Sequence, residues 1–162
     1  MNGKERREFV RGHRTAIFGY GRKTHGPSMS CVYYVMDGDD ILVSTMLGRA
    51  KAKAVERNPK VSLCVLDEKW PPTYILLYGD ATIEPDTDYK LLIAIVELMA
   101  SGKTMPEKER ADLRALGAKE QRVVVRIKPE STFETPPRQV YDAKDVKTLS
   151  HWLGNTLPWN AD

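Results

Sequence analysis

The sequence predicts a mainly β domain of the α+β kind, in which about six antiparallel strands form a closed or partly closed barrel with helices inserted between them. Short runs of β-branched and aromatic residues follow one another along the chain, separated by turn residues. The turn Asp37-Gly38-Asp39 joins two of these runs with no crossover helix, which makes that pair antiparallel. So many strands in 162 residues hide their edges best by closing into a barrel.

Local signals place the individual elements. Strands are expected over residues 14–20, 28–36, 41–46, 61–66, 73–83 and 121–127. Gly79 inside the fifth strand indicates a bulge. Helices are expected over residues 4–12, 49–57, 87–100, 106–116 and 143–152. Asp86 or Thr87 can cap the third helix, and Pro106 suits the first turn of the fourth.

Residues 1–162 are expected to form one domain, because no linker, repeat or low-complexity tract divides them. Within it, residues 87–116 form a helical insert and residues 136–162 a C-terminal tail. Trp152 and Trp159 would be exposed on this tail in a monomer, so we expect the tail to lie at a dimer interface.

Several features indicate a cytoplasmic protein. The N-terminal residues are charged and lack the apolar stretch of a secretory signal. The most apolar run, residues 91–100, is interrupted by Glu97 and is far shorter than the roughly 18 residues of a membrane span. Cys31 and Cys64 lie in apolar runs, which suggests buried thiols in a reducing compartment; a disulfide between them is the alternative.

The strongest chemical signal lies in residues 44–53, where a strand ends, a glycine follows and a helix begins with Arg49, Lys51 and Lys53. The helix dipole disfavours each cation there by roughly 0.3–1 kcal/mol. A bound phosphate would use the free N–H groups, the dipole and the cations together, with hydroxyls from Ser44 and Thr45. The alternative is an ordinary solvated helix face. The net charge of +3, with its cations concentrated in the first third of the chain, fits a local anion site better than a nucleic-acid surface.

Other motifs point to no chemistry. Residues 19–24 lack the spacing of a phosphate-binding loop. His13, His25 and His151 share no metal-ligand spacing with the cysteines, so no metal is expected. The carboxylates of residues 37–40 are expected to be solvated turn groups. No catalytic residue can be chosen from these patterns.

The order of elements resembles the pyridoxamine-phosphate-oxidase-like split β-barrels and, within them, the flavin/deazaflavin oxidoreductases, above all the branch that uses coenzyme F420. The resemblance rests on V-S-T-x-x-G-R-A-K at residues 43–51, N-P-x-V-S-L at residues 58–63 and a W…YGDATI strand. It covers residues 5–84 well and residues 121–134 in part. It implies a split barrel of the FMN-binding type that forms a homodimer with two cofactor sites at the subunit interface.

The resemblance also implies which residues form the site. Arg49 and Lys51 would hold the phosphate or acidic tail of the cofactor, and Trp70 and Trp159 would close the site. The full set implied for the cofactor is Ser28, Met29, Ser30, Val43, Ser44, Thr45, Arg49, Ala50, Lys51, Trp70 and Trp159.

The function implied by the resemblance is that of an oxidoreductase, in which F420 gives a hydride to a small electron-poor organic acceptor such as an enone or a quinone. Tyr33, Tyr74 or water are candidates for any proton donor. Lys53 and Arg57 favour F420 because it carries an acidic tail. The alternatives are an FMN-binding oxidase or reductase of the same fold and a non-catalytic cofactor-binding protein.

Two further activities are not expected. Pyridoxamine phosphate oxidase activity would require an arginine-bearing C-terminal motif, whereas residues 158–162 read Pro-Trp-Asn-Ala-Asp. A small nucleic-acid-binding barrel would interleave basic and aromatic residues on an exposed strand face, and the strand faces here are apolar. No membrane partner is expected either.

Overall fold

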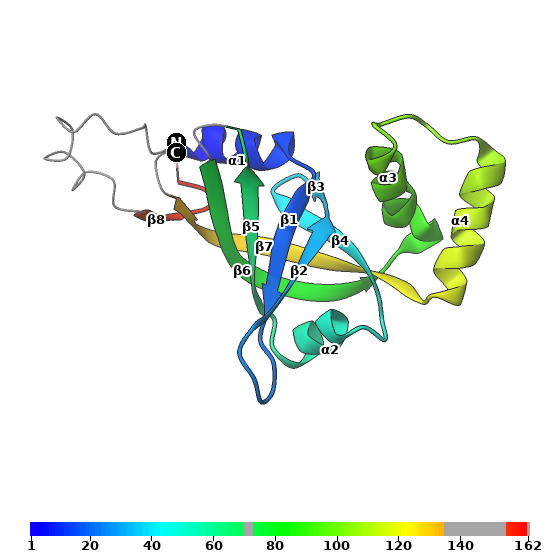
Figure 1. Ribbon diagram of the computed structural model, residues 1–162, viewed down its shortest axis with the longest axis horizontal. Helices are drawn as coiled ribbons and strands as arrows, with labels where there is room; N and C mark the ends of the chain where they lie inside the picture. The colour runs from blue at the N-terminus through cyan, green and yellow to red at the C-terminus, as the bar shows by residue number, and fades with distance from the viewer. Residues whose placement is uncertain (70–72, 135–154, 162) are drawn as a thin grey trace, which may run out of the picture.

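In the computed structural model, which describes residues 1–69, 73–134 and 155–161, the strands curl into a half-open barrel (Figure 1). The strands are β1 (Thr15–Tyr20), β2 (Ser28–Tyr33), β3 (Val35–Asp37), β4 (Asp40–Met46), β5 (Lys60–Asp67), β6 (Thr73–Pro85), β7 (Arg122–Glu134) and β8 (Asn155–Pro158). They form one sheet in the order β2-β1-β5-β6-β7-β4-β3, and β8 also pairs with β7. Each pairing is antiparallel, which confirms the predicted split-barrel fold.

The strand expected over residues 28–36 is divided at Tyr34. Before this residue β2 pairs with β1, and after it β3 pairs with β4, at the opposite edge of the sheet. The Tyr34 N–H donates to the carbonyl of Arg14, and its hydroxyl donates to the carbonyl of Val10. The ring is 1% exposed, and burial raises the pKa of its phenol. The prediction of one strand was wrong because Tyr34 is the point where the chain changes pairing partners.

The two longest strands, β6 and β7, pair from Ile75 to Pro85 of β6, with a shift in register between Tyr78 and Gly79. A Cβ atom at Gly79 would lie 2.2 Å from the Lys128 carbonyl oxygen, so a side chain at this position is sterically excluded. The predicted bulge is therefore confirmed. β7 continues past the expected end at Ile127 because β6 supplies a partner beyond the bulge.

Helices lie at both ends of the barrel and beside it (Figure 1). They are α1 (Gly3–Gly12), α2 (Ala50–Arg57), α3 (Lys90–Met99) and α4 (Glu107–Lys119), with a 3-10 turn η1 (Thr87–Tyr89) before α3. The Asp86 carboxylate accepts the N–H groups of Leu91 and Leu92 at 2.9 and 3.0 Å, so it caps α3 as the sequence predicts. α3 and α4 lie where helices were expected, although α4 continues to Lys119, and the helix expected over residues 143–152 lies outside the described residues.

The C-terminal residues pack against α1. Trp159 is 2% exposed and belongs to the core of the barrel. Arg6 is itself buried, and one of its Nη atoms donates to the carbonyls of Pro158 and Ala161. The expectation that Trp159 would be exposed in a monomer was wrong, because α1 of the same chain covers it. Trp152 lies outside the described residues.

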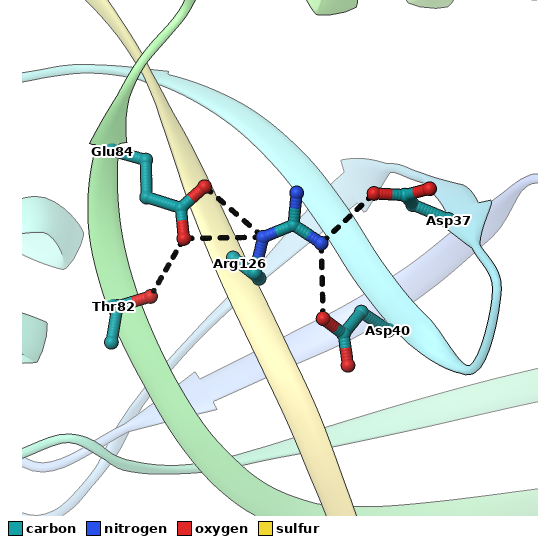
Figure 2. A network of polar contacts seen from close by, with 5 residues as sticks. All are labelled: Asp37, Asp40, Thr82, Glu84 and Arg126. Atoms are coloured by element: carbon teal, nitrogen blue, oxygen red, sulfur yellow. Dashed lines mark hydrogen bonds and ion pairs between the residues drawn. The ribbon is translucent and has the colours of Figure 1, made fainter.

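A network centred on Arg126 ties the β3–β4 hairpin to β6 and β7 (Figure 2). Its Nε donates to both oxygens of Glu84, and one Nη donates to Asp37 at 2.9 Å and to Asp40 at 3.0 Å. These partners raise the pKa of the Arg126 guanidinium. Asp37 and Asp40 are therefore ion-paired, which corrects the expectation of purely solvated turn carboxylates.

The two cysteines are free and flank Ile17 on either side, on β2 and β5. Cys31 is exposed and Cys64 is half-buried, so the expectation of buried thiols was wrong for Cys31. Both thiols lie on the outer face of the sheet. Within the described ranges, no helix has the length and apolarity needed to cross a membrane.

Candidate functional site

The junction between β4 and α2 lies at one end of the barrel, opposite α1 (Figure 1). The Leu47 N–H donates to the Gln121 carbonyl, which holds the end of β4 against the start of β7. Arg49 is the N-cap residue, and its own side chain caps none of the N–H groups of α2. The first turn of α2 contains no acidic residue. This helix terminus therefore keeps its free N–H groups and its partial positive charge.

Lys51, the second residue of α2, is half-buried, and its Nζ lies 5.9 Å from the centroid of the Phe18 ring. Burial and the nearby Arg49 guanidinium lower the pKa of Lys51, and Cys31 acts in the opposite direction. No carboxylate of the described residues forms an ion pair with Arg49 or Lys51. Two neighbouring cations without a counterion repel each other, and an anion between them would relieve that repulsion.

Two serine hydroxyls beside this pair are buried and have no hydrogen-bond partner within the described structure. They belong to Ser30 on β2 and Ser44 on β4. Ser30 is the register partner of Phe18, so both side chains lie on the same face of the sheet, and Lys51 lies over the Phe18 ring. Ser44 lines the same cavity as Lys51. A buried hydroxyl without a partner costs about 1–3 kcal/mol, which a polar ligand would recover.

A cavity of about 260 Å³ lies between β2, β4, α2 and α3. Its polar side includes Lys51, Ser44 and the guanidinium of Arg122, and its other side is an apolar stripe on α3. The residues that line it are Cys31, Val32, Tyr33, Ser44, Lys51, Leu92, Ile95, Val96, Met99 and Arg122. This volume is slightly below the roughly 300–1,000 Å³ of whole small-molecule sites, so one chain encloses only part of a large cofactor.

Of the residues implied for the cofactor, Ser44 and Lys51 line the same cavity. Arg49 is close enough to Lys51 to lower its pKa, and Ser30 is paired in register with Phe18, whose ring lies below Lys51. Ala50 is exposed at the first turn of α2 and offers its backbone N–H. Ser28 lies at the start of β2, farther along the strand than Ser30.

The other residues implied for the cofactor either lie away from the cavity or could contribute only their backbone N–H and carbonyl groups. The side chains of Val43 and Thr45 are buried in the barrel. Along these residues β4 pairs with β7 on one side, and no strand of the described residues pairs with its other edge. Met29 is 71% exposed on the outer face, beside a second hollow that Tyr20 and Tyr78 line. Trp159 lies in the core, and Arg7 of α1 donates a hydrogen bond to its carbonyl, whereas Trp70 is outside the described residues.

The sequence did not single out three parts of the cavity. Arg122 comes from the start of β7 and reaches the cavity because its register partner is Met46, at the end of β4. Cys31 lines the cavity from β2. The apolar residues 92, 95, 96 and 99 of α3 recur at helical spacing, a signal that could have indicated a second apolar face. Of the two tyrosines considered as proton donors, Tyr33 lines the cavity.

Comparison with known proteins identifies the family. The model of the pyridoxamine 5'-phosphate oxidase family matches residues 3–135. The chain belongs to this family. A search of curated proteins found no match.

Solved structures with the same fold carry different descriptions. A conserved hypothetical protein from Mycobacterium tuberculosis has a TM-score of 0.69 at 20% identity, over 89% of this chain and 94% of that chain. An F420 reductase has a TM-score of 0.59 at 19% identity, over 74% and 88% of the two chains. A heme storage protein from Vibrio cholerae has a TM-score of 0.56 at 17% identity, over 78% and 89%. At such identities the likeness shows the fold alone.

The site of this family member fits a ring ligand that ends in a phosphate. Arg49 and Lys51 supply positive charge without a counterion, and the α2 terminus supplies N–H groups. Ser30 and Ser44 supply hydroxyls that lack a partner in the described part of the chain. The α3 stripe forms an apolar wall on the other side of the cavity.

Proposed function

We propose that this chain is an oxidoreductase that binds coenzyme F420 and transfers a hydride to a small electron-poor organic acceptor, such as an enone or a quinone. The observation that carries the proposal is the pair Arg49 and Lys51, which lacks a counterion in the described structure and lies beside the partnerless hydroxyl of Ser44. Family membership and a neighbour described as an F420 reductase support the same conclusion. Bound F420 would supply the hydride.

The chain's own residues bind and orient the cofactor in this proposal. Arg49 and Lys51 pair with its phosphate, together with the N–H groups at the start of α2. The hydroxyls of Ser30 and Ser44 donate hydrogen bonds to polar atoms of the cofactor. α3 covers the cavity and excludes water, which strengthens these interactions.

FMN is the second candidate, because it presents a phosphate on the same kind of arm and Arg49 and Lys51 would recognise either group. Lys53 and Arg57 were expected to meet the acidic tail that only F420 carries. The Arg57 guanidinium donates to the carbonyls of Gly21 and Lys53, so it is already engaged. Of these two cations, Lys53 alone remains without a side-chain partner in the described structure and would favour F420.

Titrations of the purified protein with F420 and with FMN test the proposal. Lys51→Gln should weaken cofactor binding by about 10- to 100-fold, since a hydrogen bond to a charged group contributes about 1.5–3 kcal/mol. Lys108→Gln, an exposed change on α4, is the matched control and should leave affinity unchanged. Lys53→Gln should weaken F420 binding but not FMN binding.

Three results would decide against the proposal. If neither cofactor binds, or if Lys51→Gln behaves like Lys108→Gln, the assignment of the phosphate site is wrong. Tighter binding of FMN would make the flavin the cofactor. Stoichiometric binding with no reduction of any enone or quinone would favour a cofactor carrier, a role that the heme storage protein shows to be compatible with this fold.

We also propose that the protein is a cytoplasmic homodimer that joins through the outer face of β1, β2, β5 and β6. Four large apolar side chains are exposed on this face: Ile17, Met29, Leu66 and Tyr78. A second copy would cover them and complete the small cavity. Light scattering should give a dimer for the wild type and a monomer for Met29→Glu. Leu116→Glu, on the exposed surface of α4, should remain dimeric; a monomeric wild type would refute the proposal.

A further inference from the structure

We propose that the apolar stripe of α3 and the guanidinium of Arg122 form a subsite for the acceptor, and that this subsite selects a flat, apolar acceptor that carries a carboxylate. This inference rests on the proposed function, because it concerns the second substrate of that oxidoreductase. The acceptor would be selected by α3 and by the start of β7, neither of which the sequence patterns indicated as part of the site.

The first observation is that α3 presents an apolar row to the cavity, in which Leu92 and Ile95 are buried whereas Val96 and Met99 are more open. Leu91 and Ile95 pack with Val124 of β7 in a small core beside the barrel. Leu92, Val96 and Met99 face the cavity instead, together with Ile95, at positions one and two helical turns apart. Met99 is half exposed at the rim. An apolar wall of this kind favours a flat hydrophobic ligand.

The second observation is the way in which Arg122 is held. Its Nε donates to the Glu120 carboxylate at 2.7 Å, and the side chain is mostly buried. Its two Nη atoms bond to no other residue within the described ranges. A guanidinium fixed through Nε presents its two Nη groups as a fork, which matches the two oxygens of a carboxylate.

Charge balance distinguishes this arginine from the proposed phosphate pair. Arg49 and Lys51 have no carboxylate partner in the described structure, so together they suit the phosphate of a cofactor and the acidic groups attached to it. Arg122 already has Glu120 as a counterion. Because Glu120 neutralises part of the charge of Arg122, this arginine suits a ligand with one carboxylate better than the several negative charges of a cofactor phosphate and tail, which Glu120 would repel more strongly.

Binding of a redox-inert pair of probes tests this subsite without catalysis. The probes are 2-naphthoate and 2-naphthamide, which share two fused rings and differ in charge. Calorimetric titration of the full-length wild type should show that naphthoate binds about tenfold more tightly than naphthamide. Arg122→Gln should abolish this preference, and Arg122→Lys, which keeps the charge but loses the fork, should retain part of it.

Two further variants separate the wall from the phosphate pair. Val96→Thr, which is nearly the same size, should weaken both probes several-fold without changing the preference for the acid. Lys51→Gln should leave that preference unchanged while it weakens cofactor binding. If the preference disappears in Lys51→Gln and survives in Arg122→Gln, the cavity is the phosphate site and the acceptor assignment is wrong. Equal binding of the two probes to the wild type also overturns it.

The same titrations distinguish failure of this inference from failure of the proposed function. Loss of the naphthoate preference with normal F420 binding refutes only the acceptor subsite. Absence of F420 and FMN binding with a preference that depends on Arg122 refutes the oxidoreductase, and the acceptor role with it, but retains a carboxylate-binding site at Arg122. Melting temperatures of all variants show whether each one is folded.

Discussion

A single methyl group at Gly117 tests how the α3–α4 hairpin is held together. A Cβ atom at this position would lie 2.4 Å from Cδ1 and 2.7 Å from Cγ of the Tyr89 ring. These atoms lie near the root of the ring, and Tyr89 itself has a positive φ of 53°, so the ring cannot move away without a shift of the backbone. In an open helix Gly→Ala stabilises by about 0.8–1 kcal/mol. Overpacking costs about 1–3 kcal/mol, so Gly117→Ala should destabilise by up to about 2 kcal/mol.

The assay is urea unfolding of four proteins: the wild type, Gly117→Ala, Tyr89→Ala and the double variant. In the Tyr89→Ala background the obstructing ring is absent, so Gly117→Ala should become stabilising by up to about 1 kcal/mol. Ala115→Gly, at an exposed position of the same helix, should cost about 1 kcal/mol in both backgrounds and serves as the control. A stabilising effect of Gly117→Ala in the wild type would refute the close packing of α4 on Tyr89.

Three further predictions follow from buried or paired charges. Because burial raises the pKa of the Tyr34 phenol, this group ionises in the unfolded chain before it ionises in the folded protein. The free energy of unfolding should therefore fall by about 1.4 kcal/mol per pH unit above pH 10. In urea unfolding, Tyr34→Phe should flatten this decline between pH 10 and 12, although the variant loses about 1 kcal/mol at pH 7 with the hydrogen bond to Val10. In urea unfolding, Arg126→Lys should lower the free energy of unfolding by about 1–2 kcal/mol, because one ammonium group cannot bridge three carboxylates. This loss should become smaller in high salt, and a loss that salt does not change would contradict an ionic origin. Because the pKa of Lys51 is lowered, cofactor affinity should fall at a lower pH than the one at which an ordinary lysine loses its proton. Lys51→Arg stays charged and should bind the cofactor with constant affinity up to pH 10. Equal pH profiles of the two proteins in titrations would refute a role for the Lys51 proton.

Local chemistry predicted the parts of the fold that depend on neighbouring residues. The Asp37-Gly38 turn follows from the positive φ that glycine accepts, and Gly38 has φ 62°. Asp86 caps α3 because its carboxylate reaches the N–H groups a few residues ahead. The cations after Gly48 were recognised for a similar reason, since the unfavourable placement of Arg49 and Lys51 at a helix start is visible in the sequence alone.

Features set by residues far apart in the sequence could not be predicted in this way. Residues 28–36 favour a strand throughout, and the break at Tyr34 depends on which edges of the sheet meet. Trp159 looks like an exposed tail residue until Arg6 of α1 binds the backbone around it. Arg122 reaches the cavity only through the register between β4 and β7, which no local pattern specifies.

The way the barrel closes explains why the site lies where it does. β2 and β3 are consecutive in sequence yet occupy opposite edges of the sheet, so β2 and β4 come close together while no ladder joins them in the described sheet. A continuous ladder would have used the free backbone edge of β4 beyond Leu42. Because the barrel stays split, that edge remains available beside the hydroxyls of Ser30 and Ser44, and the start of α2 adds Lys51 beside it. A polar ligand at this seam would therefore hydrogen-bond to groups that a fully closed barrel would use for its own strand pairing.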